Sequence, residues 1–218
     1  MTHSNHRRGT RESLLGDWVV FTSGGGGTEA QSKKLLEIYS KNNPVAMSLG
    51  RGRGARWMKY WTPKKNSGTL EVATPEEIIN KPTTAGGSAV FDNKENVEGV
   101  LRELNEAELG FSVVVAGIFD VLDPIAKKAG LKNAPHTINM SAETFGKMEL
   151  LAEPYVLEFT TMCGHDYVSP NLVKHLLARV KDGKMTSESA AVEMAKQCTC
   201  NFFNVERARK LINAYIEK

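Results

Sequence analysis

Short apolar runs alternate with segments of helical periodicity along most of the chain, and this alternation is the strongest constraint on its fold. The runs and helical segments, in chain order, are residues 17–22, 28–41, 45–49, 89–91, 93–108, 111–116 and 118–129. A strand, a helix and a further strand in succession are typical of a βαβ unit. We therefore predict an α/β protein with a mostly parallel sheet and right-handed crossover helices.

The C-terminal part has a different pattern. After an extended piece at 135–140, the β-branched run 156–160 predicts a last strand. Three helices should follow at about 170–182, 187–197 and 205–216, because Ser169, Thr186 and Asn204 are N-cap residue types at the right places. The fold class is thus an α/β sheet followed by a three-helix segment that carries the cysteines.

The 218 residues are enough for one large domain or two small ones. We expect a disordered leader over 1–12 and a βαβ-like part over 13–61. A loop-rich excursion should occupy 62–88, with a short helix near 75–79, and an α/β part 89–218. A single domain over 13–218 is the alternative.

Composition narrows the class of protein. The net charge of +3 is too mild to argue for nucleic acid. The longest apolar run, Phe111 to Phe119, is far shorter than the roughly 20 residues that cross a bilayer, so no membrane partner is expected. Residues 1–11 contain no apolar signal core, and three cysteines do not form a disulfide framework. We therefore expect a cytoplasmic protein with reduced thiols.

The three cysteines are predicted to meet in space. The helices 170–182 and 187–197 should be about 20 Å and about 17 Å long at 1.5 Å per residue. The short connection 183–186 makes them antiparallel neighbours, so the second helix returns to the start of the first. Cys198 and Cys200 should therefore arrive beside the loop that carries Cys163 and His165.

Two metal chemistries suit these residues. Three thiolates, from Cys163, Cys198 and Cys200, can hold a [4Fe–4S] cluster that leaves one iron open to substrate, although the spacing differs from the ferredoxin patterns. With His165 as a fourth ligand, the same thiolates suit tetrahedral zinc. Buried free cysteines and a redox-active Cys198–Cys200 dithiol stay open as alternatives without a metal.

The cysteine segments also resemble a family of uncharacterised proteins from anaerobic microorganisms. The resemblance rests on Met162-Cys-Gly-His165 and on Cys198-x-Cys200-x-Phe-Phe-Asn204, followed by Arg207-Ala208, and it extends from Phe111 onward. No established activity comes with this family. An anaerobic origin, which the resemblance implies, would suit an oxygen-sensitive iron–sulfur cluster.

A glycine turn and an arginine loop are candidates for binding a small anionic ligand. Gly25 and Gly26 lie between a strand and a helix, where backbone N–H groups can approach an anion. Arg51, Arg53 and Arg56 follow the second strand, and their guanidinium groups can bind carboxylate or phosphate. The alternatives are a flexible turn, a solvated basic loop, and single-stranded nucleic acid bound with the help of the nearby tryptophans.

The leading functional hypothesis is a metalloenzyme with a three-cysteine [4Fe–4S] cluster, acting on a small anionic substrate by lyase, sulfur or redox chemistry. His165, Asp166 and His136 are the candidate acid–base residues. The second hypothesis is a non-catalytic binding or accessory protein with a zinc site, and the third is a thiol redox protein. Assembly into a homo-oligomer stays open.

Overall fold

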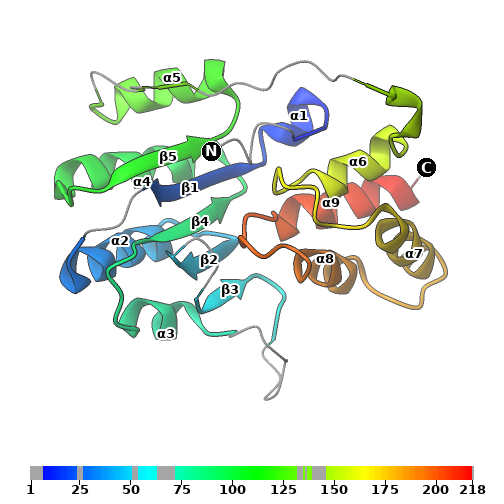
Figure 1. Cartoon of the computed structure of the whole chain (residues 1–218), viewed down its shortest axis with the longest axis horizontal. Coiled ribbons are helices and arrows are strands. Elements are labelled where there is room, and N and C mark those ends of the chain that lie inside the picture. The colour runs from blue at the N-terminus through cyan, green and yellow to red at the C-terminus, as the bar shows by residue number, and fades with distance from the viewer. Residues whose placement is uncertain are drawn as a thin grey trace.

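The structure is a computed structural model, and it describes residues 7–23, 27–50, 54–62, 72–131, 135, 137–138 and 146–217 (Figure 1). Its elements, in chain order, are α1 (Arg11–Leu14), β1 (Trp18–Ser23), α2 (Glu29–Lys41), β2 (Ala46–Leu49), β3 (Arg56–Met58), α3 (Pro75–Asn80), β4 (Gly87–Phe91), α4 (Lys94–Ala107), β5 (Ser112–Ala116), α5 (Phe119–Lys128), the 3-10 helix η2 (Met148–Leu150), α6 (Pro154–Thr160), α7 (Pro170–Lys181), α8 (Ser187–Ala195) and α9 (Val205–Ile216).

The five strands form one sheet in the order β3-β2-β4-β1-β5, and every neighbouring pair of strands is antiparallel. Strand β1 lies between β4 and β5, so that Val19 is opposite Val90 on one side and Ala116 on the other. The prediction of a mostly parallel sheet is therefore wrong.

The crossovers explain the error. Strands β1 and β2 both run antiparallel to β4, so they are parallel to each other, but β4 lies between them. Strands β4 and β5 flank β1 in the same way. This is the split βαβ arrangement of the ferredoxin-like topology, with β3 and α3 inserted before β4. A strand–helix–strand pattern looks the same in sequence whether its two strands are adjacent or separated.

Both faces of the sheet are buried. Trp18 and Val20 of β1 pack into a core with α2–α5, whereas Val19 and Phe21 pack into a second core with α6–α9. Figure 1 shows the helices α6–α9 grouped together on the right, and they contact one another in pairs. Burial on two faces gives the continuous apolar runs that are also typical of parallel sheets.

Residues 156–160 are helical, so the predicted last strand is also wrong. Helix α6 begins at Pro154, which suits the first turn because a proline there loses no helical hydrogen bond. Its buried residues, Val156, Phe159 and Thr160, follow the i, i+3, i+4 spacing of one helix face. A window of five residues, three of which are β-branched or aromatic, was too short to reveal that period.

The predicted helix starts agree with the structure more closely. The Thr28 side chain accepts a hydrogen bond from the Gln31 N–H and completes a capping box at α2. The side chains of Thr186 and Asn204 accept hydrogen bonds from backbone N–H groups at the starts of α8 and α9, without a capping box, whereas Ser169 makes no side-chain cap bond.

The N-terminal segment differs from the expected disordered leader over residues 7–12. Arg8 donates its backbone N–H to Thr161, and α1 begins at Arg11 with Thr10 as its cap. Within the described ranges, none of the helices combines the length and the apolar character that a bilayer span requires.

Candidate metal centre

Helix ends bring the three cysteines together. Cys163 lies in the turn that follows α6, and Cys198 and Cys200 lie in the turn between α8 and α9. Helices α7 and α8 contact each other, as the predicted hairpin requires. The sulfur atoms of Cys163, Cys198 and Cys200 all lie within 4.8 Å of one another. The predicted convergence is therefore confirmed, and the three residues could hold a metal ion.

His165 lies next to Cys200, on the more accessible side of the cysteine group. Its Nδ1 lies 3.4 Å from the Cys200 sulfur, which in turn lies 3.3 Å from the Cys198 sulfur. The imidazole stacks on the ring of Tyr167, with centroids 5.0 Å apart. Cys163 and Cys198 are fully buried, whereas Cys200 and His165 are half-buried. A metal ion would therefore approach from the side of His165 and Cys200.

Mutual hydrogen bonding favours one thiolate among the three sulfur atoms. Hydrogen bonds with the side chains of Cys198 and Cys200, helped by the backbone N–H of His165, lower the pKa of Cys163 to about 2. Burial raises the pKa of Cys198 well above its usual value. The hydrogen bond with Cys163 is the main cause that raises the pKa of Cys200 to about 12. A bound metal ion would replace the protons that the other two thiols keep.

The turn that carries Cys198 and Cys200 is fixed to the edge of the sheet. Arg56 of β3 donates to the carbonyl oxygens of Cys198, at 3.0 Å, and of Thr199, at 3.4 Å. Asn201, which adopts a φ of 58°, donates its side-chain amide to the carbonyl of Met47 in β2. These bonds place the two cysteines before any metal binds.

Arg56 has a different environment from the one that the sequence predicts. The expectation was an exposed arginine in a ligand-binding loop, but the residue is only 4% exposed and lies against the cysteine turn. Nothing in the spacing of the sequence indicated this contact, because it joins strand β3 to a turn that is far away in the chain. The contact of Asn201 with Met47 was missed for the same reason, whereas the stacking of Tyr167 on His165 is local and was not considered.

The other candidate residues are not brought to the cysteines by the described structure. Asp166 is exposed in the loop after His165, with a φ of 56°. Gly25, Gly26, Arg51, Arg53 and His136 lie outside the described residues. The predicted anion-binding surface therefore stays a prediction.

Comparison of the chain with protein-family models, with curated proteins and with solved structures finds no match. A fold alone does not imply a function, so the chemistry of the cysteine site has to carry the proposal.

Proposed function

We propose that Cys163, Cys198, Cys200 and His165 bind a single zinc ion, and that this ion ties the C-terminal helices to the sheet of a non-catalytic binding or accessory protein. The observation that carries the proposal is the close spacing of the three sulfur atoms, together with the contact that His165 makes with one of them. All three sulfur atoms lie within 4.8 Å of one another, and the imidazole Nδ1 lies 3.4 Å from one of them.

These distances suit one tetrahedral ion. Zinc bound at about 2.3 Å from sulfur and about 2.0 Å from nitrogen sets its ligands about 3.8 Å apart for two sulfurs and about 3.5 Å apart for sulfur and nitrogen. The Cys198–Cys200 separation of 3.3 Å and the Cys200–His165 separation of 3.4 Å are close to those values. Because only the three sulfur atoms all lie within 4.8 Å of one another, the His165 ring would have to move closer to the other sulfurs to close the site around the ion.

The number of ligands favours a structural role. Four protein ligands fill a tetrahedral shell, whereas a catalytic zinc keeps one position for water or substrate. The turn with Cys198 and Cys200 is hydrogen-bonded to β2 and β3, and Cys163 follows α6. An ion bound to all three would therefore join two helical turns at the edge of the sheet.

A [4Fe–4S] cluster is the second candidate, because three thiolates can hold it without His165. In such a cluster each thiolate binds its own iron, which keeps the sulfur ligands farther apart than around one ion. The short separation of Cys198 and Cys200 favours the single ion. A reducing compartment such as the cytosol, which the sequence predicts, would keep the thiols available for either metal.

Elemental analysis separates the candidates. The full chain is produced with both iron and zinc in the medium, purified without oxygen, and analysed for both metals and for absorption near 400 nm. We expect about one zinc ion per chain and no such absorption. Iron with acid-labile sulfide and a brown colour would support the cluster instead, and a metal-free protein with three reactive thiols would exclude both.

Variants test the ligand set. His165→Ala and Cys198→Ser should each lower the zinc content and the affinity for zinc, because each removes one of four ligands. The matched control is His175→Ala, since His175 is an exposed residue of α7. Under the cluster hypothesis, His165→Ala would keep its metal and Cys198→Ser would lose it. Zinc retained in full by His165→Ala would show that His165 is not a ligand.

A further inference from the structure

We infer that Cys198 and Cys200 form a reversible disulfide bond, and that this bond and the metal ion exclude each other. The inference rests on the proposed zinc site and adds a regulation of that same site. Under reducing conditions the two sulfur atoms would bind the ion, and under oxidising conditions they would bind each other. The turn that follows α6 would then be tied to the turn between α8 and α9 only in the reduced protein.

The separation of the two sulfur atoms carries the inference. Both thiols are free, and their sulfur atoms lie 3.3 Å apart on one turn, with Thr199 as the single residue between them. A disulfide bond is about 2.05 Å long, so the two atoms need to approach by only about 1.3 Å. Hydrogen bonds from Arg56 and Asn201 hold this turn against the sheet, so the pair stays together whether or not an ion is bound.

Cys200 is the thiol that an external oxidant would reach. It is half-buried, whereas Cys163 and Cys198 are fully buried. The Cys200 thiolate attacks a small disulfide such as oxidised glutathione, which forms a mixed disulfide and releases one glutathione thiolate. The Cys198 thiolate then displaces the second glutathione thiolate and closes the bond between the two cysteines.

The exchange balances with or without the ion. The protein loses two electrons and gains one S–S bond, and oxidised glutathione is reduced to two thiols. In the metal-free protein, the protons of those thiols come from Cys198 and Cys200. In the metal-bound protein the two cysteines are already thiolates, so the protons come from solvent and the ion leaves.

The disulfide removes two of the four proposed metal ligands. Cys163 and His165 remain, and two ligands do not fill the tetrahedral shell of zinc. An ion that binds only the reduced protein makes the pair harder to oxidise, and the disulfide in turn prevents the ion from binding. Redox conditions would therefore set the metal occupancy at a constant zinc concentration.

The reduction potential of the pair, measured with and without zinc, tests the exclusion. The full chain is equilibrated without oxygen in mixtures of reduced and oxidised glutathione, and a chelator buffer fixes the free zinc concentration. Equilibrium is approached from both the reduced and the oxidised protein, because the raised pKa values of Cys198 and Cys200 slow the exchange. Alkylation followed by mass spectrometry gives the fraction of chains that have lost two thiols, and peptide mapping identifies them.

We expect one disulfide per chain, with Cys163 as the thiol that remains free for alkylation. The reduction potential should rise by about 30 mV for each tenfold increase of free zinc above the dissociation constant of the reduced protein, because zinc stabilises the reduced pair. A potential that does not change with zinc, although the reduced protein binds the ion, would overturn the inference. A disulfide that contains Cys163, or the absence of any disulfide, would overturn it too.

Cys163→Ser and Cys200→Ser are matched variants, because each removes one proposed metal ligand but only the second removes a member of the pair. Metal-free Cys163→Ser should still lose two thiols on oxidation, whereas Cys200→Ser should keep both of its thiols. A Cys200→Ser protein that is oxidised as readily as the unmodified chain would contradict the assignment. If Cys163→Ser does not fold, the peptide map of the unmodified protein still identifies the pair.

Failure of the proposed zinc site and failure of this inference give different results. A reduced protein that binds no zinc removes the proposed function together with its regulation. A reduced protein that binds zinc, but forms no disulfide in the most oxidising glutathione mixture, removes only the regulation.

Discussion

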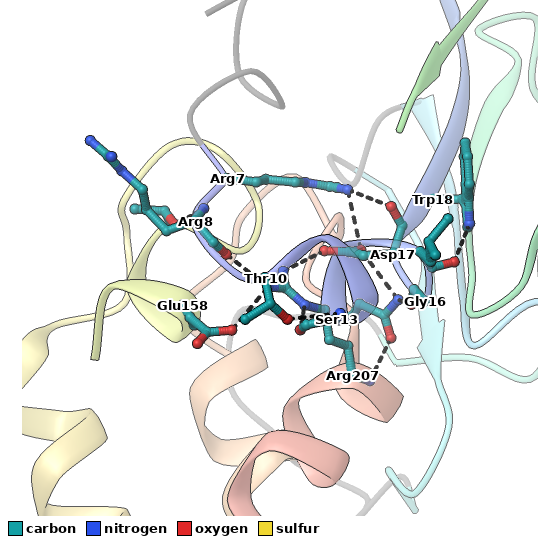
Figure 2. A network of polar contacts seen from close by, with 12 residues as sticks. Arg7, Arg8, Thr10, Ser13, Gly16, Asp17, Trp18, Glu158 and Arg207 are labelled. Carbon is teal, nitrogen blue, oxygen red and sulfur yellow. Dashed lines mark hydrogen bonds and ion pairs between the residues drawn. The ribbon is translucent and has the colours of Figure 1, made fainter. Parts of the chain in front are cut away.

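Nη1 of Arg207 lies 2.8 Å from Oδ2 of Asp17, and this ion pair joins helix α9 to the residue that precedes strand β1 (Figure 2). The side chains are only 2% and 0% exposed. Arg207 also donates to the Ser13 hydroxyl and to the carbonyl of Arg8, and Nη1 of Arg7 lies 3.2 Å from the other Asp17 oxygen. The C-terminal helix is thus fixed to the N-terminal segment through one buried carboxylate.

Replacing that carboxylate should strongly destabilise the protein. Asp17→Asn would leave Arg7 and Arg207 buried beside a neutral side chain, and removing one partner of a buried ion pair typically costs about 3–5 kcal/mol. The free energy of unfolding in urea measures the loss. The control is Asp120→Asn, because Asp120 and Arg11 form an exposed pair in which the side chains are 63% and 59% exposed. That change should leave stability nearly unchanged, and equal losses would mean that the Asp17 network contributes no more than a surface pair.

Gly9 should not tolerate a side chain. It adopts a φ of +147°, and a β-carbon there would collide with Nη2 of Arg207, which is held in place by its bonds to Asp17 and Arg8. We expect Gly9→Ala to cost about 1–3 kcal/mol, as overpacking usually does. The cost should fall when Arg207 is also changed to Ala, and the double-mutant cycle in urea measures this coupling. A cost that is the same with and without Arg207 would show that the backbone conformation, rather than the contact, is responsible.

The local elements of the fold could be predicted from sequence, but their pairing could not. Caps such as Thr28, Thr186 and Asn204 mark helix starts because they act within three residues. Strand neighbours depend on contacts between distant segments, and β4 inserts between β1 and β2 without any local signal. The prediction for residues 156–160 failed for a related reason, because the helix α6 buries these residues against distant parts of the chain, including α7.

The candidate site was predictable where helix geometry alone decides it. The short loop between α7 and α8 returns Cys198 and Cys200 to Cys163, and this needs only the helix rise and the loop length. The position of Arg56 depends on the pairing of β2 with β3 and on the packing of the cysteine turn against them. Sequence spacing carries no information about that packing.

Removing the metal should loosen the helical layer before the sheet. Because metal-binding free energy contributes to folding, chelation at neutral pH should speed amide hydrogen exchange in the turns around Cys163 and Cys198 and at the adjoining ends of α7, α8 and α9. The central strands β1 and β4 should keep their protection, since each pairs on both sides. Exchange followed by mass spectrometry, with and without chelator, measures the effect. Unchanged exchange in the cysteine turns would argue against a structural ion, and the His165→Ala protein should show no further change with chelator.

Glu206 should stabilise the protein in a pH-dependent way. Burial raises the pKa of this carboxyl, but hydrogen bonds from Arg209 and Tyr60 and the charge of Lys59 outweigh burial and bring the pKa down from 4.5 to about 2. The side chain is 6% exposed, and Nη2 of Arg209 lies 2.7 Å from it. A carboxyl whose pKa is lower in the folded state contributes stability that is fully present above pH 4.5 and is lost as the pH falls towards 2.

Glu206→Gln removes the titrating group and keeps its size. We expect this variant to be less stable than the unmodified protein near neutral pH, and the difference in free energy of unfolding should shrink steadily between pH 4.5 and pH 2. Urea unfolding of both proteins across that range measures the difference, and loss of a metal ion in acid affects the two alike. The control is Glu76→Gln, because Glu76 is an exposed residue in the first turn of α3. A difference between Glu206→Gln and the unmodified protein that does not change with pH would show that the ionised carboxylate of Glu206 is not the source of the stability.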